Sequence, residues 1–528
     1  MLILQKGWWL NKEGFNLDWA PDWLKKITVL PDIKNDDESK HFGIVFWTNP
    51  DGSVIPCGVT TLVDGEFTFV YHPDYVESPD TKDIAYRLPK KKEPYKTDNP
   101  GYMHSFFDNL VSEGWLALAQ SVALGDIPPS YLGSERQAID TSIVEKSDNT
   151  RIRYRRLLYF GKSCHGAVSL FPARGNATLI EIEDEAMSRA VASGGIIGGA
   201  QRKFLAVLDM TKKREDGTIP YHESAPFEPS THIVKLDNPS KFGIVENEVI
   251  TGLLTAHLLA NDNVATGMPG SFPLDQSGVK AVAIERFDRT QNGGRIHFEE
   301  AAQLLGIPAD KQYEGSYKEL AKLTADLMGK DGVITLFKRV IVQFLTGNAD
   351  GHLKNIAFWK DNEGKWSLVP NYDLVCTDIY QRRGDAMDRI SLHFHTQESE
   401  RGMNHRRLHD ISPKIIFTLG HIFGLQNEEI RDSVMEIAQL FPLRLVHFPE
   451  SIGGVEYNRN LMLDLLTKVN GRAEHMLGKG QSVHFGHRHP DGHGHEIVEE
   501  SHKTVYGVGI QRCFYLLKER QQSEHRGP

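Results

Sequence analysis

A short polar segment, flanked by a helical pattern and two predicted strands, constrains the fold of this chain more than any other feature. The segment is Asn-Ala-Asp-Gly-His-Leu-Lys-Asn at residues 348–355. Before it, apolar residues recur at helical spacing from Val333 to Phe344, which predicts a helix with one buried face. After it, residues 356–359 and 366–369 have the composition of two strands of a hairpin. A rigid helix and a hairpin can therefore hold the polar side chains between them in fixed positions.

Three side chains in this region have the spacing that metal-dependent phosphoryl transfer requires. Asp350 precedes Asn355 by five positions, and Asp373 follows the second predicted strand. One carboxylate can accept the proton of an attacking hydroxyl, while an amide and a second carboxylate hold Mg²⁺ on nucleotide phosphates. In protein kinases the metal-binding Asn also stands five positions after the base. The alternative is that Asn-Ala-Asp-Gly is only a turn that Asp350 caps, as in most such tetrapeptides.

Composition and charge exclude several classes of protein. The 528 residues are 40% hydrophobic and 25% charged, which are ordinary values for a globular chain with two or three lobes. No apolar run is long enough to span a bilayer, and the first residues do not resemble a secretion signal. The four cysteines lack metal-binding or disulfide spacing, and the formal charge of −10 disfavours general affinity for nucleic acid. We therefore expect a cytoplasmic protein that does not associate with membranes.

The order of strand and helix patterns predicts an α+β fold with two lobes. Strand patterns dominate the first half of the chain, and helical patterns dominate the second half. We expect a strand-rich N-terminal subdomain and a mostly helical C-terminal lobe. The expected segments are an N-terminal extension (1–40), a strand-rich subdomain (41–175), a nucleotide-binding lobe with a glycine-rich loop (176–290), a helical lobe with the polar segment (291–477) and a histidine-rich flexible tail (478–528).

A glycine-rich segment and a strand lysine could hold the phosphates of a nucleotide. Residues 193–203 carry four glycines and enter a predicted strand, and glycines let backbone N–H groups approach phosphate closely. The segment departs from the Walker A pattern, because Ala200 and Gln201 replace its Lys and Ser/Thr. Lys235 lies in an otherwise apolar strand. It is either a solvated edge residue or a phosphate contact paired with Glu248 on the next helix.

The sequence Glu-Arg-Phe-Asp-Arg at residues 285–289 ends the strand that is expected to link the two lobes. Its backbone and Phe287 could meet an adenine ring. A structural cluster of salt bridges is equally natural for these five residues.

Taken in order, these segments resemble the HipA family of bacterial serine/threonine kinases, the toxin halves of toxin–antitoxin pairs. The resemblance covers roughly residues 41–445, about three quarters of the chain. Its most specific motifs are Asn-x-Asp-Gly-His-x-Lys-Asn at 348–355 and Tyr-Asp-Leu at 372–374. The other matching motifs are Phe-Phe-Asp-Asn-Leu (106–110), Glu-Gly (113–114), Gly-Ala (166–167), Gly-Ala-Gln-x-Lys (199–203), Thr-His-Ile-Val-Lys (231–235), Glu-Asn-Glu (246–248) and Glu-Arg-Phe-Asp-Arg (285–289).

The resemblance implies an ATP- and Mg²⁺-dependent kinase with a bilobal, protein-kinase-like fold. Asp350 would be the proton acceptor, and Asn355 and Asp373 would bind Mg²⁺. The residues that the resemblance places at the nucleotide are Gly198, Gly199, Ala200, Gln201, Arg202, Lys203, Lys235, Glu285, Arg286, Phe287, His352, Leu353, Lys354, Asn355, Tyr372 and Asp373.

The resemblance also implies partners and a mode of control. Known relatives phosphorylate aminoacyl-tRNA synthetases and are restrained by a small helix-turn-helix antitoxin that binds DNA, so any contact with DNA would be indirect. Many relatives carry an autophosphorylated serine three positions before the Gly of Gly-Ala-Gln, where this chain has Ile196. The nearest serine is Ser193, so we expect little phosphorylation of this loop and control mainly by a protein partner.

Other functions stay open when the residues are considered alone. Similar ATP-binding machinery serves kinases that act on small molecules. A catalytically silent module that binds an antitoxin or represses an operon is a further alternative, against which the intact Asp350, Asn355 and Asp373 argue. Histidines between residues 484 and 495 could bind Zn²⁺ or Ni²⁺, although no predicted element fixes their geometry.

Overall fold

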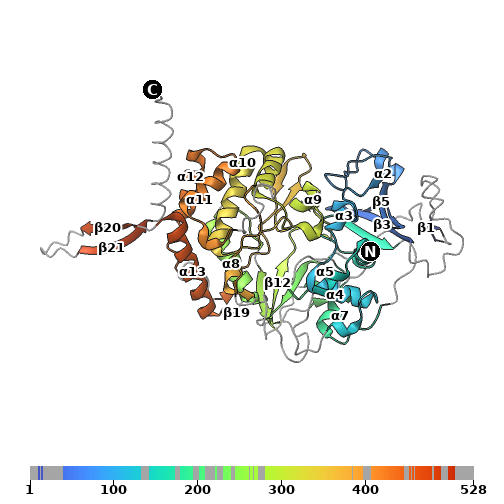
Figure 1. Cartoon of the computed structure of the whole chain (residues 1–528), viewed down its shortest axis with the longest axis horizontal. Helices are drawn as coiled ribbons and strands as arrows, with labels where there is room; N and C mark the ends of the chain where they lie inside the picture. Colours follow the sequence, from blue (N-terminus) through green and yellow to red (C-terminus); the bar gives the residue numbers. More distant parts are fainter. Residues whose placement is uncertain are drawn as a thin grey trace, which may run out of the picture. The chain divides into compact units, whose positions relative to one another are not determined.

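The structure is a computed structural model, and its regular elements form two compact units (Figure 1). The residues that it describes are 10–11, 14–15, 40–132, 142–172, 179–193, 195, 201–208, 221–222, 230–238, 244–260, 262–265, 267–271, 280–382, 385–395, 406–444, 451–452, 455–456, 458–478, 481–488 and 498–505. Unit 1 comprises residues 1–245, 267–312 and 357–364, and unit 2 comprises residues 246–266, 313–356 and 365–528.

Unit 1 begins with an antiparallel sheet of five strands in the order β6-β5-β4-β3-β7. Its strands are β3 (Lys40–Thr48), β4 (Val54–Val63), β5 (Glu66–Tyr71), β6 (Tyr95–Lys96) and β7 (Val168–Pro172). The helices of this part are α2 (Pro73–Glu77), α3 (Ser105–Asp108), α4 (Gly114–Ala123), α5 (Ser142–Ser147), α6 (Thr150–Phe160) and α7 (Glu185–Ala192). The strand-rich texture predicted from residue 41 onward is therefore present.

A second antiparallel sheet in unit 1 has the order β11-β12-β10-β8-β9. Its strands are β8 (Lys203–Leu208), β9 (Tyr221–His222), β10 (His232–Leu236), β11 (Gly267–Ser271) and β12 (Lys280–Glu285). Strands β8 and β10 are adjacent and antiparallel, so the glycine-rich segment enters a strand and Lys235 lies in a strand, as predicted. Unit 1 also contains the paired strands β13 (Phe298–Glu300) and β14 (Ala357–Lys360) and the helix α9 (Ala301–Leu305).

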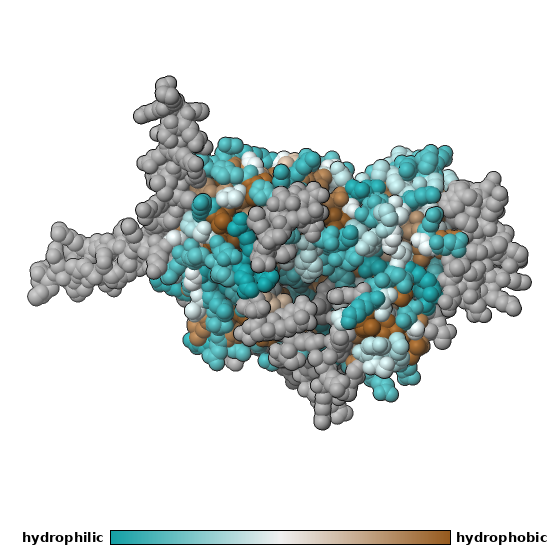
Figure 2. Space-filling model, viewed as in Figure 1, coloured by the Kyte–Doolittle hydropathy of each residue, from teal (hydrophilic) through white to brown (hydrophobic). Residues whose placement is uncertain are grey.

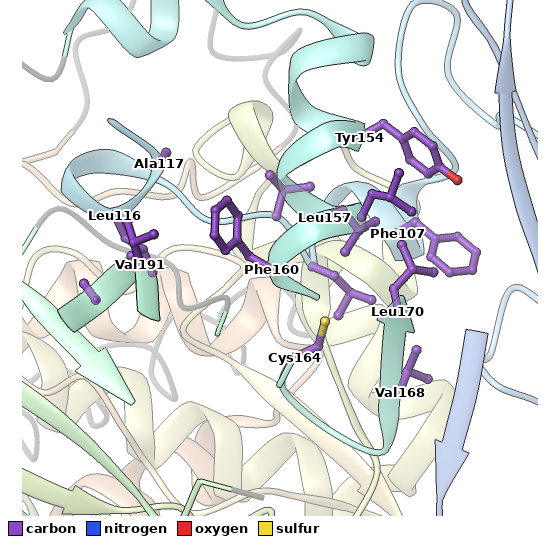
Figure 3. Close-up of a cluster of buried hydrophobic side chains, with 14 of the residues drawn as sticks. Phe107, Leu116, Ala117, Tyr154, Leu157, Phe160, Cys164, Val168, Leu170 and Val191 are labelled. Atoms are coloured by element: carbon purple, nitrogen blue, oxygen red, sulfur yellow. The ribbon is translucent and has the colours of Figure 1, made fainter. Parts of the chain in front are cut away.

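One hydrophobic core joins the two sheet regions of unit 1. Its buried side chains extend along the sequence from Val45 to Ala283, so the expected segments 41–175 and 176–290 share a core. In Figure 3, Leu157 of α6 and Leu170 of β7 lie beside Phe107. Helix α4 is buried on nearly all sides, because apolar and small residues occupy almost its whole surface.

The Phe-Phe-Asp-Asn-Leu motif has a structural role in this unit. Phe106 and Phe107 are buried in the core. The carboxylate of Asp108 receives two hydrogen bonds from the Arg153 guanidinium, at 3.0 and 3.1 Å. The Asn109 amide donates to the main-chain oxygens of Ser105 and Ile307. The motif thus joins α3 to α6 and to the segment after α9.

Two buried histidines that cap short helices predict a loss of stability in acid. Nδ1 of His72 accepts the N–H of Asp74 at 3.1 Å, and Nδ1 of His104 accepts the N–H of Phe106 at 3.3 Å. Only a neutral imidazole can accept these bonds, and burial lowers the pKa of both histidines to about 4. As the pH falls, these histidines are therefore protonated in the unfolded chain before they are protonated in the folded one. We expect the free energy of unfolding to fall as pH decreases from about 6.5 to about 4, and this contribution to be complete above pH 6.5.

Urea unfolding between pH 7 and pH 4 measures this effect. The matched variant is His72→Asn/His104→Asn, because Asn also caps helix N-termini but does not titrate. Its stability should decline less with acidity than that of the wild type. Equal slopes for the two proteins would contradict the assignment.

Unit 2 is mostly helical, as predicted. Its helices are α8 (Val245–Leu258, whose first residue belongs to unit 1), α10 (Tyr317–Thr346), α11 (Pro413–Ile422), α12 (Asn427–Ala438) and α13 (Arg459–Leu477). Helix α10 begins with a capping box between Ser316 and Glu319 and is interrupted at Gly329. Helices α10 to α13 lie in the second half of the chain, where helical patterns were predicted to dominate. Strand β15 (Trp366–Leu368) and strand β14 lie at the positions predicted for two strands after residue 355.

Short strand pairs complete the described structure. They are β1 (Leu10–Asn11) with β2 (Gly14–Phe15), β16 (Gln381–Arg382) with β17 (Asp385–Ala386), β18 (Ser451–Ile452) with β19 (Val455–Glu456), and β20 (Gln481–Arg488) with β21 (Val498–Val505). The last pair lies in the histidine-rich segment, which its composition predicted to be a flexible tail. Backbone hydrogen bonds hold such a pair, and a histidine-rich composition does not prevent them.

The hydropathy of the surface is that of an ordinary globular protein, as the composition predicts. The face seen in Figure 2 is mostly hydrophilic, and hydrophobic residues appear there in smaller areas. Among the described residues, no helix has the length and apolar character needed to cross a bilayer.

Candidate active site

The loop that carries Asp350 begins where α10 ends. Gly347 follows the helix with φ of 81°, a left-handed conformation that favours glycine. A Cβ at Gly347 would lie 2.7 Å from Sγ of Cys376 and 2.7 Å from an Nη atom of Arg472, so the position has no room for a side chain. The left-handed conformation and the lack of space for a Cβ both call for glycine at this position, where the chain leaves α10 toward Asp350.

Hydrogen bonds within the loop join Asp350 to Asn355. The N–H of Asp350 donates to Oδ1 of Asn348 at 3.0 Å, and its carbonyl oxygen accepts the N–H of His352 at 2.9 Å. The same carbonyl accepts Nδ2 of Asn355 at 2.9 Å. The spacing of five residues therefore corresponds to a direct contact. Because Nδ2 of Asn355 is engaged, its Oδ1 is the side-chain atom suited to a cation.

The residues between Asp350 and Asn355 are all buried. Nδ1 of His352 accepts the N–H of Lys354 at 3.2 Å, and its ring lies edge-on to Tyr313. Leu353 is fully buried and packs closely on Gly315. A Cβ at Gly315 would lie 2.5 Å from Cδ1 of Leu353. These contacts give Leu353 a packing role, although the resemblance places it at the nucleotide.

The Asp350 carboxylate has surroundings that strengthen it as a base. Burial raises its pKa above the usual value, His352 opposes the rise, and the nearby Asp373 adds to it. Hydrogen bonds from Ser391 and Tyr313 act against the rise. A carboxylate with a raised pKa accepts a proton more readily than an ordinary aspartate.

Asp373 has an unusual backbone conformation. Its φ is 55°, and among the described residues Asp64 is the only other non-glycine residue with a positive φ. Asp64 lies in an Asp-Gly turn between β4 and β5, where such a conformation is common. Outside such turns a left-handed residue carries strain of about 1–3 kcal/mol, and strain of this kind is concentrated at functional sites. The next residue back, Tyr372, ties Asp373 to the loop by donating its hydroxyl to the carbonyl of Lys354 at 2.6 Å.

A buried asparagine of the Glu-Asn-Glu motif fixes the chain after Asp373. The Asn247 side chain, on α8, accepts the N–H of Cys376 at 3.1 Å and donates to its carbonyl at 3.0 Å. Thr251, one turn later, also accepts the Cys376 N–H. No pattern in the sequence indicates this pairing, because the partners are 129 residues apart.

The donor set in unit 2 fits Mg²⁺ held together with phosphates. Mg²⁺ takes one or two carboxylates and completes its octahedron with water and phosphate oxygens. Asp373 and Asn355 supply a carboxylate and an amide oxygen of this kind. In the part of the chain that the structure describes, no group of three or more His, Cys, Asp or Glu side chains forms a metal cage, which Mg²⁺ on a nucleotide does not need.

In unit 1, the two predicted lysines lie opposite each other. Lys203 on β8 is the register partner of Lys235 on β10, and both are buried. Side chains directly opposite on antiparallel strands have Cβ atoms about 4.5–5.5 Å apart, and like charges there repel. The expected pairing of Lys235 with Glu248 joins residues of different units and stays a prediction.

The structure gives Arg286 a structural role. Its guanidinium donates to the Asp288 carboxylate at 2.9 and 3.0 Å, to Oγ of Ser230 at 2.8 Å and to the carbonyl of Cys164 at 3.1 Å. Its main-chain N–H donates to Thr231. Of the two interpretations of residues 285–289, the buried salt-bridge cluster holds for Arg286. The nucleotide contact that the resemblance implies for residues 285–287 would therefore have to come from Glu285 or Phe287.

The same cluster explains the Gly-Ala motif at residues 166–167. Gly166 has φ of 67° and donates its N–H to Oδ2 of Asp288 at 2.8 Å. A Cβ at Gly166 would lie 3.1 Å from Nδ1 of His297. Burial alone would raise the pKa of Asp288, but Arg286 and Arg289 hold it well below the usual range. The carboxylate therefore stays charged and fixes Gly166.

The neighbours of Arg286 face different surroundings. Glu285 is exposed at the end of β12, opposite His232 of β10. Phe287 is half-buried, and its ring packs against Phe298 and Trp359 at centroid distances of 5.1 and 6.1 Å.

Only the ends of the glycine-rich segment fall among the described residues. Gly198, Gly199 and Ala200 lie outside them, as does Ile196. The carbonyl of Gly195 accepts Nε2 of Gln120 at 2.9 Å, which docks the start of the segment on α4. At its other end, Gln201 and Arg202 are half-buried, and Arg202 pairs with Asp184 at 3.7 Å.

We expect Ser193 to remain unphosphorylated in the presence of Mg-ATP. Its side chain is 1% exposed, and its hydroxyl donates to the carbonyl of Ala190 at 2.8 Å at the end of α7. A phosphate dianion could not be accommodated there without unwinding this turn. Intact-mass and peptide mass measurements after incubation with Mg-ATP should show little phosphate on residues 190–200. Stoichiometric phosphate on Ser193 together with loss of activity would contradict this prediction.

Comparison with known proteins agrees with the fold. The sequence profile of the HipA N-terminal domain matches residues 55–130, and that of the HipA-like C-terminal domain matches residues 195–442. The chain is 27% identical over 340 residues to Y4dM, a kinase candidate of Sinorhizobium fredii, covering 61% of this chain and 75% of that one. It is 32% identical over 174 residues to the serine/threonine-protein kinase toxin HipA of Shewanella oneidensis, covering 29% of this chain and 38% of that protein.

A solved structure shares the fold. It is the complex of HipA and HipB of Shewanella oneidensis with operator DNA, in which the similar chain is 20% identical with a TM-score of 0.56. The match covers 81% of this chain and 96% of that one.

An α+β fold with this loop and these motifs defines a kinase-like enzyme. The predicted fold class is thereby confirmed. Both halves of the family pattern are present in order along the sequence. The chain belongs to the HipA family of kinases.

Proposed function

We propose that this protein is an ATP- and Mg²⁺-dependent serine/threonine protein kinase that acts in the cytoplasm as the toxin of a toxin–antitoxin pair. It would arrest growth by phosphorylating a translation component such as an aminoacyl-tRNA synthetase. The observation that carries the proposal is the arrangement of the loop in unit 2. There, Asn355 is bonded to Asp350, and Asp373 is held in a left-handed conformation close enough to influence the Asp350 carboxylate.

Each residue would have a definite part in the reaction. Asp350 would accept the proton of the attacking Ser or Thr hydroxyl, for which its raised pKa suits it. Asn355 and Asp373 would hold Mg²⁺, which when bound neutralises charge on the phosphates. Lys203 and Lys235 would contact phosphate oxygens from neighbouring strands. Glu285 and Phe287 would lie at the adenine.

The relatives support the proposed serine/threonine specificity and the proposed partner. The similar Shewanella protein is named a serine/threonine-protein kinase toxin, and the structure with the same fold is a complex with HipB and operator DNA. We propose that this chain likewise binds a small helix-turn-helix antitoxin and meets DNA only through it.

Transfer of label from ATP tests the chemistry. The purified full chain is incubated with γ-labelled ATP and a bacterial lysate, with Mg²⁺ or with excess EDTA. We expect a labelled protein band only with Mg²⁺, and phosphoserine or phosphothreonine after hydrolysis of that band. Label that appears only in small molecules would favour a small-molecule kinase and overturn the proposal.

Growth after induced expression tests the toxin role. The wild type should arrest growth, and co-expression of its antitoxin should restore it. Asp350→Asn should not arrest growth. Arrest by both forms would point to sequestration of a partner instead of catalysis.

A further inference from the structure

A serine remote in sequence contacts the carboxylate of Asp350 directly. Oγ of Ser391 lies 3.2 Å from Oδ1 of Asp350 and 2.8 Å from the carbonyl oxygen of Ala349, and it can donate to either. The main-chain N–H of Ser391 also donates to the Ala349 carbonyl, at 2.9 Å. Ser391 therefore contacts both the base and the residue before it.

The chain on both sides of Ser391 is fixed by other parts of unit 2. The N–H of Ile390 donates to the carbonyl oxygen of Arg406 at 2.8 Å, and the N–H of His393 donates to the carbonyl oxygen of Gly315 at 3.3 Å. In return, the N–H of Tyr317, in the first turn of α10, donates to the carbonyl of His393 at 2.8 Å. A side chain held on such a backbone presents its hydroxyl in one place.

Asp388 secures the same segment, three residues before Ser391. Its carbonyl accepts the N–H of Leu408 at 2.9 Å. Its carboxylate pairs with Arg407 and with His409, each at 3.0 Å. Residues 388–393 thus form a strap between the Asp350 loop, the start of α10 and residues 406–409.

We infer that Ser391 is a positioning residue for the base, and that its hydroxyl fixes the orientation of the Asp350 carboxylate. This inference rests on the proposed function, in which Asp350 accepts the substrate proton. A carboxylate can rotate about its terminal bond, and a misplaced base loses much of its effect on the rate. When its hydroxyl donates to Asp350, Ser391 holds one carboxylate oxygen, and the strap holds Ser391.

The neighbours of Asp350 do not provide the same anchor. Tyr313 also hydrogen-bonds the carboxylate, but its side chain is 43% exposed. His352 and Asp373 act on Asp350 through their charges. Ser391 is 9% exposed and lies on a backbone bonded on both sides. It is therefore the donor best suited to define one geometry.

Ser391→Ala tests the inference in the full chain, with transfer of label from ATP to the lysate band as the assay. We expect the rate at saturating ATP to fall by about 10- to 100-fold, since misplacement of a catalytic group commonly has an effect of this size. The ATP concentration at half-maximal rate should change less than about twofold, because the proposed nucleotide contacts are untouched. Calorimetric titration with Mg-ADP should give the same affinity as the wild type.

Three further variants separate positioning from a merely structural role. Ser391→Thr keeps the hydroxyl and should restore the rate to within about threefold of the wild type. Ser391→Cys keeps the shape with a weaker donor, so its rate should lie between those of Ser391→Ala and the wild type. Ser433→Ala is the matched control, because Ser433 is also a buried serine of unit 2 but bonds only the carbonyl of Glu429 in its own helix. It should behave as the wild type.

The inference and the proposed function fail in different ways. If Asp350→Asn keeps wild-type activity, the assignment of the base is wrong. If Asp350→Asn is inactive but Ser391→Ala transfers label at the wild-type rate, the positioning role is wrong. It is also wrong if Ser391→Ala loses nucleotide affinity and Ser391→Thr does not restore the rate. Should Ser391→Ala be too unstable to assay, equal rates for Ser391→Cys and the wild type would overturn the inference.

Discussion

Asp350→Asn is expected to lower phosphoryl transfer by roughly 100- to 10,000-fold, the range that a general base commonly contributes. The substitution removes the proton acceptor but keeps the shape of the side chain. The main-chain carbonyl that binds Asn355 is also kept. Binding of Mg-ADP, measured by calorimetric titration, should therefore stay within a few-fold of the wild-type value. Label transfer from ATP to protein measures the rate.

Asp331→Asn is a suitable control for this experiment. Asp331 is an exposed aspartate on α10, away from the loop, so the same chemical change there should leave the rate unaltered. A wild-type rate for Asp350→Asn would mean that another group accepts the proton. A loss of nucleotide affinity as large as the loss of rate would mean that Asp350 binds the metal or nucleotide instead.

Asp373→Asn should abolish activity for a different reason. It removes a charged ligand from the proposed Mg²⁺ site but keeps a side chain that tolerates the left-handed backbone. Even indirect partners of metal ligands contribute 10- to 100-fold to affinity, so we expect Mg²⁺-dependent nucleotide binding to weaken by at least about tenfold. Titration of ADP with and without Mg²⁺ separates this effect from binding that needs no metal.

The chain offers a matched control for the backbone of Asp373. Asp64 is the other non-glycine residue with a positive φ among those described, and it is exposed in a turn of unit 1. Asp64→Asn makes the same substitution in the same conformation without touching the site. Its Mg²⁺-dependent affinity should equal that of the wild type. If Asp373→Asn and the wild type bind Mg-ADP equally well, Asp373 is not a metal ligand.

The two experiments together assign separate roles within one loop region. Loss of rate without loss of affinity identifies the base, and loss of metal-dependent affinity identifies the ligand. Burial is the main reason that the pKa of Asp350 is raised, and the charge of Asp373 adds to the rise, so the two residues are coupled.

Features that depend on near neighbours in the chain could be predicted from the sequence. The spacing of Asp350 and Asn355 identified the loop, and their contact closes within five residues. Helical periodicity located the second half of α10, and strand composition located β14 and β15. Such patterns persist because backbone geometry repeats at fixed intervals along a helix or strand. The family resemblance added the order of the motifs, and the family profiles match residues 55–130 and 195–442.

Other features depend on segments that only the folded chain brings together. Ser391 meets Asp350 across 41 residues, and Asn247 meets Cys376 across 129. The sequence left two interpretations for Arg286, a contact with the nucleotide or a structural salt-bridge cluster. In the structure Arg286 is buried and bonded to Asp288, which favours the salt-bridge cluster. The pairing of Lys203 with Lys235 depends on the register of β8 and β10. A shift of one residue would place the two side chains on opposite faces of the sheet. The sequence alone determined which groups can do the chemistry, because their types and local spacing are written in it. Tertiary structure decided which partners orient them, because hydrogen bonds between distant side chains form only when packing has placed both ends.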